Sequence, residues 1–397
     1  MDTAVPRSTR AGKYVMQTGG HRAFIPKPLP PDPPLTIDSD LLTLLSRADR
    51  ALGRLDGIAV AVPDPDFFLA MYVRKEAVLS SQIEGTQTSL LHLLEYEARG
   101  TSRRLPPDVS EVVRYVDAMN YGLERLKDLP LSLRLLREIH ARLLAAGRGA
   151  ERDPGEFRRS QNWIGPAGCT LTDAMFVPPP VLDMVDALGD LERFIHEGGA
   201  LPALVKCALI HCQFETIHPF LDGNGRLGRL LIAFYLCQQG ILRHPMLYLS
   251  YYLKKNRQEY YDRLMAVREK GDWEGWVVFF LRGVADIADE ATDVAQRLVR
   301  MREEHRSLVE AEIPRTHNAL RVLSGLYRQP VITVAAAQSH LGISYASANR
   351  LIARLTNIGI LKAITSGERN RVFAYAPYLE LFVDGPITEE VAATLIE

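Results

Sequence analysis

The sequence is typical of a globular protein of two or three domains. It has 397 residues, 47% of them hydrophobic, and a formal net charge of −1 at pH 7, which excludes a strongly basic or acidic protein. Four cysteines in a chain of this length exclude a disulfide scaffold, so we expect a reducing, cytoplasmic location. No apolar run reaches the roughly 20 residues that a membrane helix needs, so no membrane contact is expected.

The first quarter of the chain is predicted to be a tail followed by helices. Residues 1–35 contain six prolines between positions 26 and 34, which favours an extended polyproline geometry along the surface. Residues 36–107 form a mainly helical region, broken near Pro63 and Pro65, with a helix expected over 66–83. Asp64 or Asp66 suits the N-cap of that helix, because aspartate accepts the free N–H groups of a first turn.

Residues 108–290 are predicted to form the core of the protein. Helices are expected over 109–127 and 131–144. Between residues 162 and 180 the pattern changes, because a turn at Gly165, Pro166 and Gly168 separates two short stretches of strand-forming residues. These stretches predict a β-hairpin. Their residues are Trp163 and Ile164 before the turn and Cys169, Thr170 and Leu171 after it.

The most informative segment follows a predicted helix over 201–217. Residues 218–229 read His-Pro-Phe-Leu-Asp-Gly-Asn-Gly-Arg-Leu-Gly-Arg, and an apolar, helix-forming stretch continues to residue 236. Gly223 and Gly225 let the backbone turn tightly and bring its N–H groups close to an anion. Because the loop also leads into a helix N-terminus, the sequence predicts a phosphate site.

Two other interpretations of this region are weaker. The three glycines also match G-x-G-x-x-G, but a helix rather than a strand precedes them, and the next acid after Asp222 is Glu259. Both conditions for a dinucleotide fold therefore fail, and no P-loop sequence is present. His211 with Cys207 and Cys212 suggests a zinc site, but the spacing contains no C-x-x-C pair and fits a packed helix face better.

The last part of the chain predicts a separate DNA-binding type of module. A linker helix over 291–314 leads to a domain over 315–397, with helices at 318–327, 333–341 and 345–355. Strand-like stretches at 359–361 and 372–375 flank a polar turn at 366–370, an order that resembles a winged helix-turn-helix.

Residues 315–375 of this module are strongly basic. They hold eight basic residues and one acidic residue, Glu368, a local charge of +7. This is the electrostatic pattern of phosphate-backbone binding, and the DNA contacts would be Arg350, Arg354, Arg369 and Arg371. A protein–protein or homodimer module is the alternative.

The segment 218–229 resembles the signature of Fic-domain enzymes, His-x-Phe-x-(Asp/Glu)-Gly-Asn-Gly-Arg-x-x-Arg, at every fixed position. The resemblance covers roughly residues 40–290. It includes Pro-Gly-Glu-Phe-Arg at 154–158 and Gln-Asn-Trp-Ile-Gly at 161–165, where a flap begins, and residues 252–257 with Tyr260 and Tyr261 after the signature. The resemblance implies a mainly helical fold and the Mg²⁺-dependent transfer of AMP from ATP to a Ser, Thr or Tyr hydroxyl of a target protein, or of the enzyme itself.

The family pattern assigns each residue of the segment a role that fits its chemistry. His218 would be the general base, a role that suits an imidazole with an ordinary pKa near 6.5. Asp222 would hold Mg²⁺, which usually takes one or two carboxylates together with phosphate oxygens. The remaining nucleotide-binding positions would be Gly223, Asn224, Gly225, Arg226, Arg229, Tyr252 and Asn256.

The flap and one variable position add to this assignment. The hairpin residues Trp163, Ile164, Cys169, Thr170 and Leu171 would dock the target as an added strand. Relatives with lysine at the position of Gly225 transfer phosphate, so glycine favours nucleotidyl transfer.

Residues 80–85, Ser-Ser-Gln-Ile-Glu-Gly, are similar to the inhibitory motif of the family. The resemblance implies that Glu84 pairs with Arg229 and turns it away from the γ-phosphate. The alternative is that Glu84 only ends a helix before Gly85. In some relatives the same glutamate serves to remove AMP.

The sequence thus predicts a mainly α protein with four parts: an N-terminal helical inhibitory region, a Fic helical core, a small hairpin flap and a C-terminal winged helix. The expected activity is that of an autoinhibited protein adenylyltransferase. The alternatives are a DNA-binding regulator with a nucleotide-sensing core, and an enzyme that removes AMP by means of Glu84.

Overall fold

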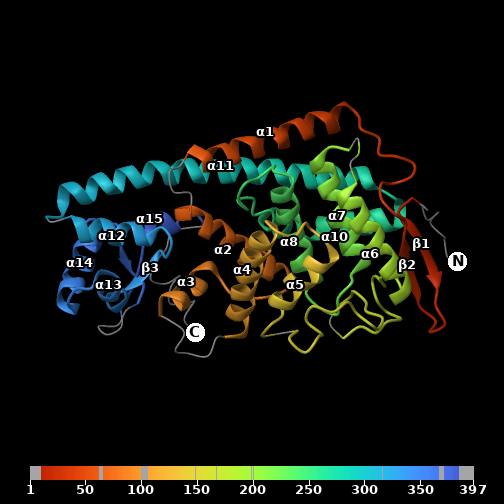
Figure 1. Ribbon diagram of the computed structural model, residues 1–397, viewed down its shortest axis with the longest axis horizontal. Coiled ribbons are helices and arrows are strands. Elements are labelled where there is room, and N and C mark those ends of the chain that lie inside the picture. Colours follow the sequence, from red (N-terminus) through yellow and green to blue (C-terminus); the bar gives the residue numbers. More distant parts are fainter. Residues whose placement is uncertain are drawn as a thin grey trace.

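The computed structural model describes residues 10–61, 66–99, 106–147, 149–166, 168–197, 199, 201–314, 316–365 and 371–383. Most of these residues are helical, and the short strands lie at the two ends of the molecule (Figure 1). The helices are α1 (Ser39–Ala61), α2 (Asp66–Ile83), α3 (Leu90–Arg99), α4 (Pro107–Arg125), α5 (Leu133–Leu143), α6 (Val181–His196), α7 (Ala203–Ile217), α8 (Asn224–Gln238), α9 (Ser250–Lys255), α10 (Arg257–Lys270), α11 (Trp273–Glu312), α12 (His317–Leu326), α13 (Val334–Leu341), α14 (Tyr345–Asn357) and α15 (Ala376–Leu379). The strands are β1 (Gly12–Met16), β2 (Arg22–Pro26), β3 (Val331–Thr333), β4 (Lys362–Ala363) and β5 (Val372–Ala374).

Helices α7 and α8 form the centre of the core. Every residue of α7 except Ala203 and Lys206 is buried, which is why its sequence has no polar face. Residues 226–232 of α8 are buried as well, and α4, α5, α6, α10 and α11 pack around the pair. The predicted phosphate loop joins these two helices, so both of its ends are held by buried helices of the core.

A long pair of parallel helices, α1 and α11, runs along one side of the molecule (Figure 1). Helix α11 has 40 residues and begins at an N-cap, where the side chain of Asp272 accepts the N–H of Gly275. The sequence predicts one long helical stretch from residue 276 to about residue 309, with its part from residue 291 as a linker outside the core. In the structure Ala291, Ala295 and Leu298 are buried, so α11 belongs to the core well beyond that point.

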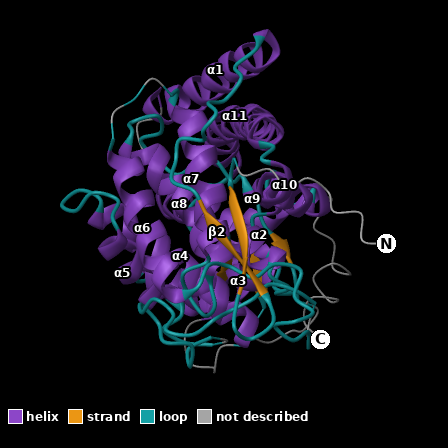
Figure 2. Cartoon of the chain, turned by 90° about the vertical axis from the view of Figure 1, so that its right-hand side faces the viewer, coloured by secondary structure: helices purple, strands orange, loops and turns teal. Residues whose placement is uncertain are grey.

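The N-terminal segment differs from the predicted proline-rich tail. Residues 12–26 form the antiparallel hairpin β1–β2, in which Gly12 pairs with Pro26 and Met16 with Arg22. Strand β2 packs against α6 and α7, and Gln213 Nε2 donates to the carbonyl oxygen of Lys27 at 2.8 Å. Figure 2 views the molecule from this end and shows β2 in front of the helices. Only the segment after residue 26 has the irregular course expected of the prolines.

The C-terminal unit contains α12, α13 and α14 with a three-stranded antiparallel sheet in the order β3-β5-β4. The helices agree with the predicted ranges to within a few residues, whereas β3 was not expected and β4 lies at 362–363 instead of 359–361. The polar turn at 366–370, with Glu368 and Arg369, lies outside the described residues. The winged helix-turn-helix interpretation stays a prediction.

This unit packs directly on the N-terminal helices. Strand β3 contacts α3, and Gln329 Nε2 donates to the carbonyl oxygen of Leu94 at 2.9 Å. The ring of Phe382 meets the ring of Tyr72 on α2 edge-on, with centroids 5.6 Å apart. Within the described residues, no helix combines the length and apolar character that crossing a membrane requires.

Candidate functional site

The loop between α7 and α8 is fixed by unusual backbone geometry and by its own hydrogen bonds. His218 ends α7 in the left-handed region, with φ 49°, and its N–H donates to the carbonyl oxygen of Phe214 at 2.9 Å. Gly223, with φ 76°, precedes α8. The side chain of Asn224 bonds both the N–H and the carbonyl oxygen of Phe220, at 2.9 and 2.8 Å. Asn224 therefore holds the loop closed, and the buried ring of Phe220 anchors it in the core.

His218 is partly buried, and the Nδ1 atom of its imidazole is fully buried. Its Nδ1 has no hydrogen-bond partner among the described residues. Burial lowers the pKa of His218 to about 4, and the positive charges of Arg268 and Arg158 add to this effect. His218 is thus neutral at neutral pH, as a general base must be.

Arg226 provides an unusual buried cation in the first turn of α8. Its side chain is only 1% exposed, and none of its three guanidinium nitrogens has a hydrogen-bond partner within the described part of the chain. The carboxylates of Glu111 and Asp222 approach it to 3.5 and 3.7 Å, which balances its charge without satisfying its donors. A buried donor set of this kind normally has a partner, so the site suits an anion such as phosphate.

The donor set around Asp222 fits a hard cation. The Asp222 side chain is 32% exposed, and its Oδ1 accepts the N–H of Gly223 at 2.6 Å. It therefore has an accessible oxygen beside the helix N-terminus where phosphate is expected. This agrees with the preference of Mg²⁺ for a carboxylate together with phosphate oxygens.

Arg229, the last residue of the segment, is tied to helix α2. Its Nη2 donates to Glu84 Oε1 at 2.7 Å, and it also donates to the side-chain and backbone oxygens of Ser80 at 2.7 and 2.9 Å. Burial alone would lower the pKa of Arg229, but the charges of Glu84, Tyr260 and Glu215 and the hydrogen bond to Glu84 together raise it. The expected Glu84–Arg229 pair is therefore present, and it holds the guanidinium on α2.

The position of Glu84 explains why residue 225 is glycine. A Cβ atom at Gly225 would lie 2.3 Å from Glu84 Oε1 and 3.1 Å from a guanidinium nitrogen of Arg229. A larger residue would make the carboxylate shift, so Gly225 leaves room for the Glu84–Arg229 pair as well as for the close approach of an anion.

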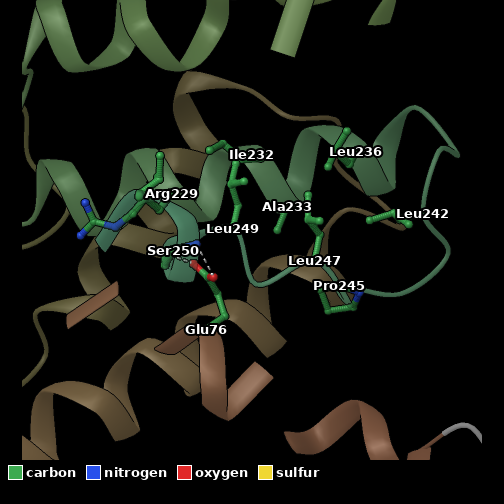
Figure 3. Close-up of a pocket in the computed structure, with 11 residues that line it drawn as sticks. Glu76, Arg229, Ile232, Ala233, Leu236, Leu242, Pro245, Leu247, Leu249 and Ser250 are labelled. Carbon is green, nitrogen blue, oxygen red and sulfur yellow. Dashed lines mark hydrogen bonds between the residues drawn. The ribbon is translucent and has the colours of Figure 1, made fainter. Parts of the chain in front are cut away.

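An acidic residue of α2, Glu76, anchors this helix to the core near Arg229. Glu76 projects from α2 toward the start of α9 in a pocket of about 330 Å³ of empty space, open mouth included (Figure 3). It accepts the N–H of Ser250 at 3.1 Å, the hydroxyl of Ser250, and the hydroxyl of Tyr115 at 3.2 Å. Apolar side chains of α8 and of residues 242–253 line the rest of the pocket, so these polar contacts fix the position of α2 beneath Arg229.

Three side chains that support the loop were missed in the sequence. His140 on α5 stacks on Phe220 at 3.8 Å, accepts the N–H of Gly155, and donates from Nε2 to the carbonyl oxygen of Asp222 at 3.0 Å. Arg158 and Asn162 both donate to the carbonyl oxygen of His218, each at 3.1 Å. They lie 56 to 82 residues from the loop atoms that they bond, so no local spacing could have shown these roles.

The predicted flap is less regular than a two-stranded hairpin. Only Ile164 pairs in an antiparallel bridge, and its partner is Phe176 instead of a residue of the stretch 169–171. Trp163 is 42% exposed, and its Nε1 donates to the carbonyl oxygen of Cys169 at 3.1 Å. Thr170 bonds Thr172 and Asp173, so a compact turn replaces the expected second strand.

The other predicted residues occupy structural positions. The ring of Tyr252 packs against Phe279 and Gly283 of α11, and the side chain of Asn256, between α9 and α10, donates to the carbonyl oxygen of Tyr252. His211 bonds the carbonyl oxygen of Gly228 and the hydroxyl of Tyr260 through its two ring nitrogens, which agrees with the packed-face interpretation. The four cysteines are free.

Replacing Glu215 with glutamine is expected to reduce the loss of stability as the pH rises from 5 to 8. Burial raises the pKa of Glu215 to about 7, and its Oε1 has no hydrogen-bond partner within the described residues. A raised carboxyl pKa stabilises the fold below the unfolded value near 4.3, and this stability is lost as the pH rises through 7. The free energy of unfolding of Glu215→Gln minus that of wild type should therefore increase by on the order of 3 kcal/mol between pH 5 and pH 8.

Urea unfolding of the two proteins at both pH values measures this difference. The exposed Glu124→Gln serves as the control and should give the same small difference at both pH values. A difference between wild type and Glu215→Gln that does not change with pH would contradict the prediction.

Comparison with known proteins agrees with the sequence resemblance. Residues 42–124 match the Fic/DOC family N-terminal model, and residues 130–236 match the Fic/DOC family model. The protein adenylyltransferase Fic of Drosophila grimshawi is 29% identical over 180 residues, which are 45% of this chain and 33% of that protein. The protein of the same name from Aedes aegypti is 31% identical over 166 residues, which are 41% of this chain and 29% of that protein.

The fold has a counterpart among solved structures, whereas the curated relatives are only partly covered. The chain spans about a third of the length of the curated relatives it matches. The crystal structure of a Fic family protein from Desulfovibrio desulfuricans G20 aligns with a TM-score of 0.54 at 18% identity, over 86% of this chain and 97% of that one. Residues 42–124 are thus a Fic/DOC family N-terminal region, and residues 130–236 are a Fic/DOC family domain.

Proposed function

We propose that this protein is a Mg²⁺-dependent protein adenylyltransferase that moves AMP from ATP to a Ser, Thr or Tyr hydroxyl of a target protein. The observation that carries the proposal is the pair of unsatisfied buried groups in one loop. A neutral imidazole with a free Nδ1, at His218, and a guanidinium with three free nitrogens, at Arg226, lie on either side of Asp222 and the glycine turn. A base, an anion site and a carboxylate are the groups that nucleotidyl transfer needs.

In the proposed reaction, the oxygen of the target hydroxyl forms a bond to the α-phosphorus of ATP as the bond to the bridging oxygen breaks. His218 takes the proton of the hydroxyl, and the pyrophosphate leaves with the electrons of the broken bond. The N–H groups at the start of α8 hold the phosphates in place, because they have no partner within the helix. Arg226 then finds the hydrogen-bond partners that it lacks in the described structure.

Mg²⁺ bound at Asp222 would offset the negative charge of the phosphates. In the proposed active state Arg229 leaves Glu84 and binds the outer phosphate, so the pair with Glu84 is the inhibited form. This assignment rests on the 2.7 Å contact and on the absence of space at Gly225 for both a side chain and the Glu84 carboxylate.

The test is incubation with Mg²⁺ and ATP labelled on either the α- or the γ-phosphate. Label from the α-phosphate on the protein itself, weak in wild type, stronger in Glu84→Gly and absent in His218→Ala, is the expected result. Label from the γ-phosphate would indicate phosphate transfer instead. If ATP binds to every variant but no label appears on the protein itself or on added proteins, the adenylyltransferase proposal fails.

The C-terminal unit supports DNA binding as a second candidate function. Helix α14 contains no acidic residue, and its outer face exposes Tyr345, Arg350 and Arg354. Arg371, immediately before β5, donates to the side-chain oxygen of Asn349 of the same helix at 2.9 Å. These residues form a basic surface suited to a phosphate backbone. Arg369 is a further basic residue two positions before Arg371 in the sequence.

Arg350→Glu should weaken the binding of duplex DNA at least tenfold and reduce its dependence on salt, because one phosphate contact becomes a repulsion. Fluorescence anisotropy with a labelled duplex at 50 and 200 mM salt measures both effects. Arg306→Glu, on an exposed part of α11, is the control and should not change binding. Equal affinity of wild type and Arg350→Glu would exclude α14 as the DNA-binding helix.

A further inference from the structure

Resting on the proposed adenylyltransferase activity, we infer that Arg158 is a positioning residue that couples the flap to the general base. Arg158 follows α5 in the chain and precedes the flap, residues 160–179. Its side chain is only 1% exposed, and no carboxylate forms an ion pair with it in the described part of the chain. Its donors bond backbone carbonyl oxygens instead.

These carbonyl oxygens belong to the two ends of the flap and to the catalytic loop. Nη1 donates to Ser160 at 3.2 Å, Nη2 donates to Pro179 at 2.5 Å, and Nε donates to His218 at 3.1 Å. The backbone N–H of Arg158 donates in addition to the carbonyl oxygen of Pro219 at 2.9 Å. One rigid guanidinium thus joins both ends of the flap to the residue that carries the base.

His218 needs this support because its backbone is strained. A non-glycine residue in the left-handed region costs about 1–2 kcal/mol, and the surrounding contacts must hold it there. The bonds from Arg158 and Asn162 fix the carbonyl group of His218, while the bond to Phe214 fixes its N–H. Together they determine the direction in which the imidazole points.

The chemistry of arginine suits this role better than that of lysine. The three nitrogens of the planar guanidinium bond three carbonyl oxygens that lie in different directions. Lysine has a single ammonium nitrogen on a flexible side chain, so it cannot hold the three oxygens in a fixed arrangement. Docking of a target strand on the flap would restrain Ser160 and Pro179, and through the same guanidinium it would restrain His218. Target binding and orientation of the base are therefore linked.

The test compares Arg158→Lys with Arg137→Lys, both in the Glu84→Gly background. Arg137 is a matched control because it also donates to a backbone carbonyl of the same segment, that of Gly155, but it does not reach His218. Arg158→Lys should lower the kcat of labelling at least tenfold and leave the Kd for ATP within twofold. Arg137→Lys should change neither quantity.

Hydrogen–deuterium exchange gives a readout that does not depend on activity. In Arg158→Lys, exchange should rise together in peptides covering 160–179 and 218–223, and not in α1 or α11. Asn162→Ala, which removes the other donor to His218, should raise exchange at 218–223 without affecting 176–179. If exchange rises in the flap alone or throughout the protein, or if kcat is unchanged, the inference is overturned. If the Glu84→Gly parent shows no labelling, the proposed function fails, while the exchange result still decides the coupling.

Discussion

Replacing Glu84 with glycine is expected to raise the rate of AMP transfer by about ten- to a hundredfold. The Glu84–Arg229 bond is charge-assisted, and such bonds contribute roughly 1.5–3 kcal/mol. Removal of the carboxylate leaves Arg229 with only the oxygens of Ser80, so the guanidinium becomes free to bind the outer phosphate. Because α2 ends at Ile83, glycine at position 84 does not interrupt the helix. The initial rate of incorporation of α-labelled AMP, at saturating ATP, measures the effect.

Two further variants separate the loss of the Glu84 charge from the loop flexibility that an added glycine brings. Gln87→Gly adds a glycine to the same loop, at an exposed side chain, and should leave the rate at the wild-type value. Glu84→Gln keeps the size of the side chain but removes its charge, so its rate should lie between those of wild type and Glu84→Gly. A Glu84→Gly protein that labels no faster than wild type would show that the pair does not inhibit the enzyme.

Replacing His218 with alanine in the Glu84→Gly background is expected to lower the rate by about 10²–10⁴-fold, the usual contribution of a general base. The Kd for ATP should stay within twofold, since the phosphate-binding groups are the loop backbone and the arginines. The exposed His196→Ala serves as the control for loss of a histidine and should be fully active. Comparable loss of ATP binding and of rate in His218→Ala would point to a collapsed loop instead of a missing base.

The pH dependence of kcat/KM tests the same residue without a substitution at His218. The active form of a general base is the neutral form, and the pKa of His218 is lowered to about 4 by burial. The profile of Glu84→Gly should therefore be flat between pH 6 and 8. A fall of kcat/KM toward low pH with a midpoint near 6.5, the ordinary pKa of histidine, would contradict the lowered pKa of His218.

Local patterns were sufficient to predict most helices and the residues of the phosphate loop. Helix α2 has the predicted bounds, and the order of groups in 218–229 identified the loop between two helices. The Glu84–Arg229 contact was found as well, although 145 residues separate its partners, because the resemblance covered both motifs.

The parts that could not be predicted depend on contacts between distant segments. A single sequence has no periodic pattern that marks contacts with distant segments or the burial of a polar side chain. The roles of four residues were missed for this reason: His140, Arg158, Glu76 and Glu215. The hairpin β1–β2 was hidden by the neighbouring prolines, which suggested an extended tail. In the flap, turn residues predicted a regular hairpin, but hydrogen bonds of Thr170 and Trp163 favour a compact turn.

The length and burial of α11 determine how the two ends of the molecule can move relative to each other. A helix of 40 residues spans roughly 60 Å at 1.5 Å per residue. It begins among the core aromatic residues Trp273 and Trp276 and ends beside the C-terminal unit, without a glycine-rich joint between them. A displacement of the C-terminal end of α11 therefore has to bend this helix or slide it along α1.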